Sequence, residues 1–451
     1  NVEESAKILK EKGSIIRSYP KKLKLPLGIL IADTAISDGD AKTANVYLQA
    51  ISEEDLNPME VDQLAFIEGQ LQNLVGNFDS AVEAWEATAK GEYRPSVVRA
   101  IRNRAELLLA SKKITTEEVI KDLEGLQFDW RGGDFEFGVL RKISRYYLQA
   151  NKFKSGLRAL RSAATYFPGH ALAPEVAEEM SDVFNELYLN DGADMMSPIE
   201  SLGLFDEFKE LTPSGEKGDT MIRKLADRLA KVDLLGRAAE LLQRQFDFRL
   251  KGAEKAQVGA RLATIRVLNK EPELALAALQ KSNVTGLPPL FVAERLKLQA
   301  RALIDLGRQK EALEILKDDK SREADLLRNE VFWKAKEWQE SVSVLRRLVR
   351  STEAAPGKPL DERQALFVLN LGVALALAGY DTGSAKLLAD YGSAMDNTTL
   401  KDAFRLIASP GATGLVDFRS VAGKVKTVSN FKSFMAGYKE RLKEGKLSQL
   451  N

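Results

Sequence analysis

Apolar residues recur along this chain at intervals of three and four positions, which places them on one face of an α-helix. Segments with this period follow one another along most of the chain, for example residues 95–111, 174–189, 219–232 and 253–268. No segment alternates β-branched and polar residues between turn signals, as a β-strand would. The pattern therefore predicts an all-α protein of about 18–22 helices with no sheet.

The helices are predicted to form pairs with one repeated spacing. In the clearest pair, Ser144 stands seven residues before Asn151, and Gly156 and Ala163 follow before a helix-ending proline at Pro168. Small residues are needed where two antiparallel helices cross closely. The turn between the helices needs a residue that accepts left-handed backbone angles, which Gly and Asn do best.

The same spacing returns at four other places. A small residue stands seven positions before a glycine in three of them, the pairs Gly69 and Gly76, Ala300 and Gly307, and Gly372 and Gly379. In the fourth, Asn329 is followed by Phe332, and Ala81 and Ala312 take the position of Gly156 in two of the units. These positions resemble the tetratricopeptide repeat, a unit of about 34 residues with two helices. The resemblance implies a right-handed α-α superhelix, or solenoid, whose first helices line a ligand-binding groove.

The predicted solenoid is interrupted once. Residues 191–218 contain Gly192, Pro198, Gly203 and Pro213, so we expect an irregular insertion or a break there. This segment separates an N-terminal solenoid at residues 1–190 from a C-terminal solenoid at residues 219–408. Residues 409–451 no longer follow the repeat, and we expect them to form a helical cap on the exposed end of the solenoid.

The C-terminal segment carries a more specific prediction. One helical face of it presents Phe431, Phe434, Met435 and Tyr438. In the repeat around Gly372, the positions predicted to line the groove are also all apolar, namely Leu366, Leu369, Val373, Ala376 and Leu377. An exposed apolar stripe of this size is unusual on a soluble protein. We expect the C-terminal segment to cover it, directly or through a helix at residues 400–407. The alternative is a docking partner helix.

A second resemblance concerns the C-terminal part of the chain. Residues 324–338, with the sequence ADLLRNEVFWKAKEW, and the apolar residues 371–379 look like the C-terminal part of long tetratricopeptide-repeat proteins of alphaproteobacteria. The resemblance carries no functional motif. It favours a protein associated with the bacterial cell envelope.

Residue types that most catalytic sites need are scarce. The chain has no cysteine and one histidine, His170, in a predicted loop. Thiol catalysis, histidine bases and the common zinc sites therefore lose their usual residues. No glycine-rich phosphate loop is present. We predict no catalytic residue, no cofactor site and no metal site. A pair of carboxylates in an aromatic cleft, as in an all-helical glycosidase, stays open as an alternative.

Charge argues against nucleic-acid binding. The 66 basic and 65 acidic residues give a net charge of +1, whereas nucleic-acid binders usually carry a basic surplus. A basic cluster at Arg94, Arg99, Arg102 and Arg104 has no interleaved aromatic residues that would stack on bases. We expect this cluster to be a solvated or partner-facing surface.

Other features bear on the compartment. No apolar run is long enough to span a bilayer, so we predict no membrane insertion by this chain. The absence of cysteine favours the periplasm, where stray thiols form wrong disulfides, with the cytoplasm as the alternative. The first residue is Asn1 and no signal peptide follows, so we expect a processed or truncated piece of a longer protein. The oligomeric state stays open.

The predicted function is a non-enzymatic protein–protein interaction scaffold in a bacterial envelope-associated assembly. The residues predicted to line its groove for a protein or peptide partner are Phe66, Gln70, Asn73, Arg141, Arg145, Lys297, Arg301, Asp305, Glu330 and Trp333. The alternative is a platform that handles envelope polysaccharide or peptidoglycan. Sugars stack on exposed aromatic rings, so the tryptophans discriminate between the two functions. The repeat places Trp85 and Trp338 in the core, whereas Trp130 and Trp333 are free to face outward.

Overall fold

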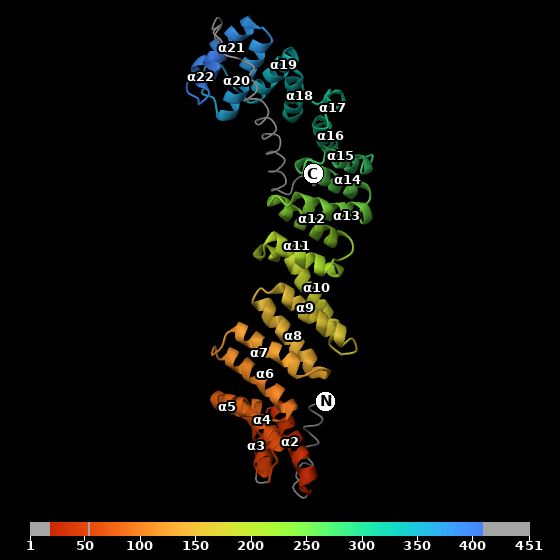
Figure 1. Ribbon diagram of the computed structural model, residues 1–451, viewed down its shortest axis with the longest axis vertical. Helices are drawn as coiled ribbons and strands as arrows, with labels where there is room; N and C mark the ends of the chain where they lie inside the picture. The colour runs from red at the N-terminus through yellow and green to blue at the C-terminus, as the bar shows by residue number, and fades with distance from the viewer. Residues whose placement is uncertain (1–18, 53–54, 409–451) are drawn as a thin grey trace. The chain divides into compact units, whose positions relative to one another are not determined.

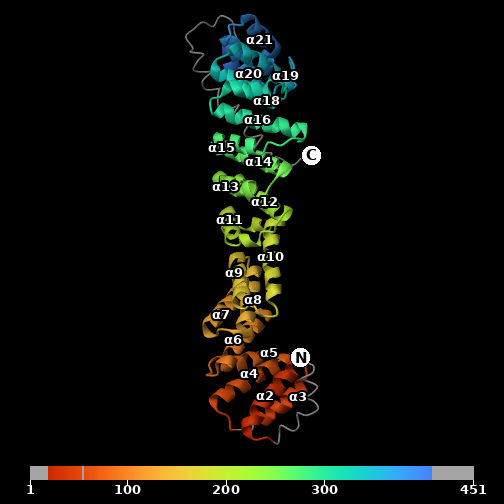
Figure 2. The ribbon, with the colours of Figure 1, turned by 90° about the vertical axis from the view of Figure 1, so that its right-hand side faces the viewer.

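The computed structural model describes residues 19–52 and 55–408 of the chain. These residues form twenty-one α-helices, α2 to α22, and two short 3-10 helices, with no strand among them. Figure 1 and Figure 2 show successive helices laid one against the next. The prediction of an all-α solenoid of about 18–22 helices is confirmed. The chain divides into two compact units between Leu187 and Tyr188.

Unit 1 contains the described residues up to Leu187. Its helices are α2 (Lys21–Ser37), α3 (Ala41–Ser52), α4 (Pro58–Leu74), α5 (Phe78–Ala89), α6 (Arg94–Ala110), α7 (Thr116–Asp129), α8 (Gly133–Gln149), α9 (Phe153–Tyr166) and most of α10 (Ala173–Leu189). From α2 to α9 each helix packs on the next, and α2, α4 and α6 also contact one another in turn. The first helices of successive pairs therefore form one layer, and the second helices lie against it.

Unit 2 begins at Tyr188, in the last turn of α10. Its elements are η2 (Gly192–Met195), α11 (Pro198–Glu207), η3 (Lys209–Leu211), α12 (Glu216–Lys231), α13 (Leu235–Phe248), α14 (Gly252–Leu268), α15 (Pro272–Lys281), α16 (Pro289–Asp305), α17 (Gln309–Leu316), α18 (Arg322–Ala335), α19 (Trp338–Ser351), α20 (Glu362–Leu377), α21 (Asp381–Met395) and α22 (Lys401–Ala408). The helices α14, α16 and α18 contact one another in turn, as the first helices of unit 1 do. The segment expected to be irregular, residues 191–218, holds α11 between the two 3-10 helices.

A spacing of seven residues recurs in ten helices, each of which is the first helix of a pair. A buried residue stands seven positions before a residue with positive φ, and this second residue forms the turn into the next helix. The ten pairs are Ala32 and Gly39, Gly69 and Gly76, Ala105 and Lys112, Ser144 and Asn151, Phe184 and Asp191, Ala226 and Asp233, Ala263 and Lys270, Ala300 and Gly307, Asn329 and Lys336, and Gly372 and Gly379. The spacing predicted at five places is thus present at ten.

Small residues stand where paired helices touch. A Cβ added to Gly69 would lie 2.5 Å from Nε1 of Trp85, and one added to Gly156 would lie 2.7 Å from the side chain of Leu148. The hydroxyl of Ser144 donates a hydrogen bond to the carbonyl of Gly156 at 2.9 Å. This contact joins α8 to α9 at the crossing that the sequence pattern predicted.

The apolar stripe on α20 is largely covered within the described residues. Leu369 is 1% exposed and Val373 is 3% exposed. The short helix α22 packs on α20 and α21, and side-chain atoms of Phe404 and Ile407 lie 3.8 Å from the position of a Cβ on Gly372. A helix expected at residues 400–407 therefore lies against α20. The residues predicted to form the cap or docking helix, Phe431, Phe434, Met435 and Tyr438, lie outside the described residues, as does all of 409–451.

Candidate partner-binding surface

In each unit, the residue that follows each buried position of the ten pairs marks one edge of that unit's first helices, since adjacent helix positions point about 100° apart. We call these residues the ladder: Asp33, Gln70, Glu106, Arg145, Asn185, Asp227, Thr264, Arg301, Glu330 and Val373. All of them except Val373 are polar or charged. Ladder residues of neighbouring first helices bond each other, as Gln70 does with Asp33 and Arg301 does with Glu330. Bonds between ladder residues thus join neighbouring first helices at α2 and α4 in unit 1 and at α16 and α18 in unit 2.

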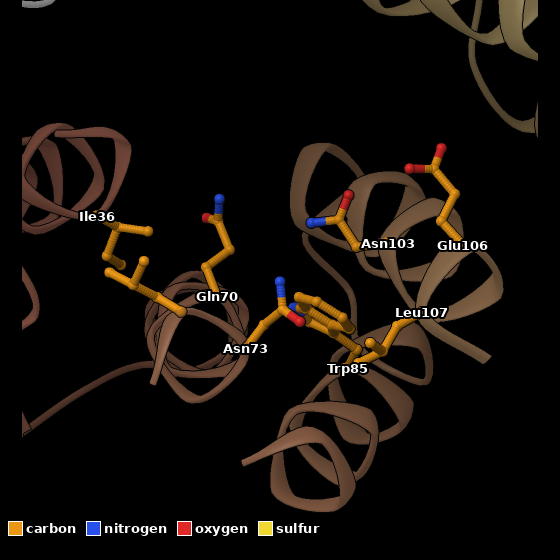
Figure 3. Close-up of a pocket in the computed structure, with 8 residues that line it drawn as sticks. Ile36, Gln70, Asn73, Trp85, Asn103, Glu106 and Leu107 are labelled. Carbon is orange, nitrogen blue, oxygen red and sulfur yellow. The ribbon is translucent and has the colours of Figure 1, made fainter. Parts of the chain in front are cut away.

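Unit 1 has a hollow on this side of the layer. Its volume is about 380 Å³, and α2, α4 and α6 supply all of its lining except one indole from α5. The lining residues are Ile36, Gln70, Asn73, Leu74, Trp85, Asn103, Glu106 and Leu107. Figure 3 shows Gln70, Asn73 and Asn103 projecting from their helices around the open space. We call this space the unit 1 hollow.

Three carboxamides give the unit 1 hollow its chemistry. Gln70 hydrogen-bonds the carboxylate of Asp33, which leaves its Oε1 atom buried with no hydrogen-bond partner among the described residues. Asn103 accepts hydrogen bonds from Nε of Arg102 at 3.2 Å and from Nη2 at 3.0 Å. Asn73 is exposed at the rim. A carboxamide can donate and accept at the same time, which is the pairing that a peptide main chain requires.

Charged groups surround the carboxamides. Burial raises the pKa of Asp33 above its usual value, although Arg99 and the hydrogen bond from Gln70 oppose the shift. Burial also lowers the pKa of Arg102, with Glu106 opposing that shift and Arg99 adding to it. The ammonium of Lys142 lies 2.6 Å from Oε1 of Glu106, which neutralises the one carboxylate that lines the hollow.

In unit 2, ion pairs between neighbouring first helices occupy the ladder carboxylates Asp227 and Glu330. Arg261 on α14 pairs with Asp227 on α12, and the guanidinium is only 3% exposed. Burial still raises the pKa of Asp227, although Arg261 opposes it. Arg301 on α16 pairs with Glu330 on α18. Burial alone would raise the pKa of Glu330, but Arg301 and Lys334 outweigh it and hold this pKa below its usual value. These groups satisfy one another and leave little for a ligand to bond.

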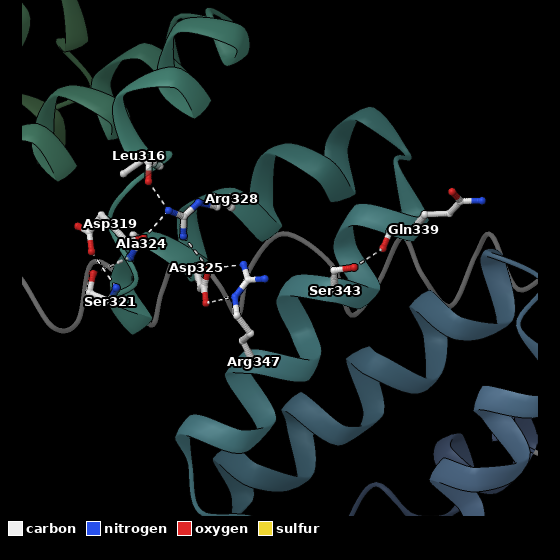
Figure 4. A network of polar contacts seen from close by, with 9 residues as sticks. All are labelled: Leu316, Asp319, Ser321, Ala324, Asp325, Arg328, Gln339, Ser343 and Arg347. Carbon is white, nitrogen blue, oxygen red and sulfur yellow. Dashed lines mark hydrogen bonds and ion pairs between the residues drawn. The ribbon is translucent and has the colours of Figure 1, made fainter.

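A further polar network in unit 2 belongs to packing. Asp325 accepts hydrogen bonds from Arg328 at 2.6 Å and from Arg347 at 2.7 Å, as Figure 4 shows. Arg328 also donates to the main-chain carbonyls of Leu316 and Asp319. The network ties α18 to α19 and to the turn before α18, so its donors and acceptors are already used.

The structure separates the predicted groove residues into two sets. Gln70 and Asn73 meet in the unit 1 hollow, whereas Phe66 is buried at 4% exposure and is not among the lining residues. On α8, Arg141 is held by Glu175 and Glu179, and Arg145 is exposed.

In unit 2, five predicted groove residues lie close together on α16 and α18. They are Lys297, Arg301, Asp305, Glu330 and Trp333, and all except Asp305 are buried. Arg301 binds both Asp305 and Glu330, while Lys297 lies 3.9 Å from Glu323. A role in partner contact stays a prediction for all ten groove residues.

The tryptophans offer little exposed ring surface. Trp85 is 2% exposed and Trp333 is 3% exposed. The expectation that Trp333 is free to face outward was wrong, because its ring packs edge-to-face on Trp338 with centroids 5.4 Å apart. Trp130 is half-buried and its Nε1 donates to the carbonyl of Gly132 at 3.2 Å.

Sequence reasoning missed Asn103, Glu106 and Asp33. The helix α6 was not recognised as a first helix with the repeat spacing, because Lys112 rather than Gly or Asn forms its turn, with a φ of 58°. The available signal was Ala105, a small residue that stands seven positions before Lys112.

Comparison with known proteins adds no relative. No family model matches the chain, and no curated protein matches it significantly.

In the described part of the chain, no helix is long and apolar enough to cross a membrane. Nor does that part bring together three His, Asp or Glu side chains that could hold a metal ion. The fold and the recurring pairs define the class of protein: the chain is a helical-repeat solenoid.

Proposed function

We propose that this chain is a tetratricopeptide-type, non-enzymatic interaction scaffold that holds an extended segment of a partner protein in the unit 1 hollow. The observation that carries the proposal is the carboxamide of Gln70, whose side chain lines the open space and whose buried Oε1 has no partner among the described residues. A buried acceptor without a hydrogen bond costs about 1–3 kcal/mol. A turn of the carboxamide about its terminal torsion would present Oε1 to an N–H group of a ligand, which would remove this cost.

A peptide main chain suits the rest of the hollow as well. Asn73 and Asn103 stand on neighbouring first helices and add further donors and acceptors beside Gln70. The apolar side chains of Ile36, Leu74 and Leu107 line the same space and suit apolar side chains of a ligand. Backbone pairing with apolar side pockets is a common way for proteins to bind extended peptides.

The proposed setting is a bacterial envelope-associated assembly, in the periplasm. It is supported by the absence of cysteine from the chain and by the resemblance of residues 324–338 to alphaproteobacterial repeat proteins. Handling of an envelope polymer is the weaker alternative, since the buried and half-buried tryptophans present no broad ring face for a sugar.

Site-specific photo-cross-linking tests the proposal. A photoreactive phenylalanine replaces exposed Asn73 at the rim, and cross-linked proteins are identified by mass spectrometry from cells of the native host. We expect a discrete partner whose yield falls at least tenfold when Gln70→Ala and Asn103→Ala are added. The matched control is Gln280→Ala, an exposed carboxamide on α15.

Two results contradict the proposal. One is a yield that the double variant leaves unchanged. The other is the same set of cross-linked proteins when the photoreactive residue replaces Gln280 instead of Asn73.

A further inference from the structure

Three arginines of unit 1 form no ion pair with a carboxylate in the described part of the chain. They are Arg99 and Arg102 on α6, whose positions share one helix face with Asn103 and Glu106 of the unit 1 hollow, and Arg145 on α8. Asp33 acts on Arg99, and Glu106 acts on Arg102, only through longer-range attraction. Arg145 is the ladder residue of α8 and is exposed. The basic ladder residue of unit 2, Arg301, is different because it has a carboxylate partner on the neighbouring first helix.

The other arginines of α6 provide an internal comparison. Arg94 pairs with Asp129 at 2.5 Å, and Arg104 pairs with Glu86 at 2.7 Å. Both partners lie on second helices, α7 and α5, so these two arginines serve contacts between the layers. The four arginines that the sequence grouped as one cluster therefore serve two different sets of contacts.

Two of the three arginines named above, Arg99 and Arg102, stand on α6, which supplies part of the unit 1 hollow, although none of the three is among the lining residues. Arg102 reaches the hollow through two hydrogen bonds to Asn103, which is part of the lining. Its guanidinium lies 5.2 Å from the centre of the Phe135 ring, which fixes its position without neutralising its charge. Arg99 is exposed one turn earlier on α6, and Arg99 and Arg102 are close enough to repel each other.

We propose that the partner segment held in the unit 1 hollow is acidic, and that Arg99 and Arg102 bind its carboxylates while the carboxamides bind its main chain. This inference rests on the proposed function and names the chemistry of its ligand. Burial of the Arg102 guanidinium with no carboxylate in direct contact is unfavourable, although Glu106 offsets part of this cost from a distance. The planar fork of donors on an arginine matches a carboxylate. Arg145 extends the same basic face onto α8.

Defined peptides test the charge of the ligand. Three fluorescent peptides of equal length alternate Ala with Asp, with Asn or with Lys, and their binding to the full chain is measured by fluorescence anisotropy. We expect the Asp peptide to bind at least tenfold more tightly than the Asn peptide, and the Lys peptide to bind least. Arg99→Gln with Arg102→Gln should remove that preference, and added salt should weaken the Asp peptide most.

The matched control removes the same charge from the same helix. Arg94→Gln with Arg104→Gln leaves the unit 1 hollow intact, so the preference for the Asp peptide should persist. Equal loss in both double variants overturns the inference, because charge alone then explains the binding. Equal affinity for the Asp and Asn peptides, both weakened by Gln70→Ala, overturns the inference but supports the proposed function. Failure of all three peptides to bind overturns both.

Discussion

Arg301 on α16 forms an ion pair with Glu330 on α18, and the two side chains are only 2% and 8% exposed. Asp305 also binds Arg301, and Lys334 lies 2.7 Å from Glu330. The sequence assigned all of these charges except Lys334 to a partner-binding groove, whereas in the structure they bind one another across neighbouring first helices. The corresponding place in unit 1 holds carboxamides and an unpaired acceptor, so the two units differ in what they offer to a ligand.

Breaking the buried pair should destabilise unit 2. Arg301→Met removes the main partner of a buried carboxylate, which we expect to cost about 3 kcal/mol. Arg301→Met combined with Glu330→Leu should recover most of this loss, since no buried charge is then left alone. Urea denaturation measures both variants. The control Arg308→Gln removes an exposed pair with Glu311 and should change little. If Arg301→Met alone is as stable as the wild type, then the loss of the ion pair leaves no costly buried charge and the prediction is wrong.

Enlarging a helix crossing should also cost stability. Ala81 is 0% exposed on α5, so Ala81→Leu overpacks its contact with the neighbouring helices and should cost about 1–3 kcal/mol. Gly156 and Ala312 should behave in the same way. Ala87→Leu, at an exposed position of the same helix α5, is the control and should be nearly neutral. Thermal melting compares the two variants. Equal melting temperatures would contradict the prediction that Ala81 stands at a close helix crossing.

Replacement of Lys336, in the turn between α18 and α19, should increase the stability of the protein. This residue has a φ of 61°, in the left-handed region that favours glycine. Lys336→Gly should therefore stabilise the protein by up to about 1 kcal/mol. Lys386→Gly, at an exposed position inside α21, should destabilise it by about 1 kcal/mol. Opposite shifts of the urea midpoint confirm the prediction, and a loss in both variants contradicts it.

The pH dependence of Asp33 should have a defined sign. Burial raises the pKa of this carboxyl in the folded chain above its usual value of 3.8. As pH falls through that raised pKa, the folded state takes up a proton before the unfolded state does, so the wild type gains stability. Asp33→Asn has no such proton, and any advantage it has at pH 7 should shrink on acidification and vanish below pH 3.8.

Asp79 supplies the opposite control. Its hydrogen bond from Lys113 and the charge of that lysine lower its pKa, so its contribution is lost as pH falls. Asp79→Asn should therefore be less stable than the wild type at pH 7, by a small amount because the pair is exposed. Urea midpoints between pH 7 and about pH 2.5 test both variants, because the contribution of Asp79 is lost only below its usual pKa of 3.8. Parallel pH profiles of the two variants would contradict the assignment.

The sequence by itself determined the fold class and the register of five repeats. Helical periodicity and helix-forming residues left no room for a sheet. Where the turn residue is Gly or Asn, as at Gly76 and Asn151, its tolerance of positive φ identifies the spacing directly. The contacts at Gly69 and Gly156 followed from the same reasoning, because only small residues fit where helices cross.

Only the tertiary structure decided the other repeats and the site. Packing of the flanking helices outweighs about 1 kcal/mol of local strain and holds three non-glycine turn residues at positive φ, namely Lys112, Asp233 and Lys270. Their residue types do not predict this conformation. Likewise, an arginine on a helix face has the same sequence signature whether or not a carboxylate lies opposite. The geometry between helices pairs Arg301 with Glu330, whereas among the described residues no carboxylate lies within ion-pair distance of Arg99, because an ion pair depends on distance across the layer and not along the chain.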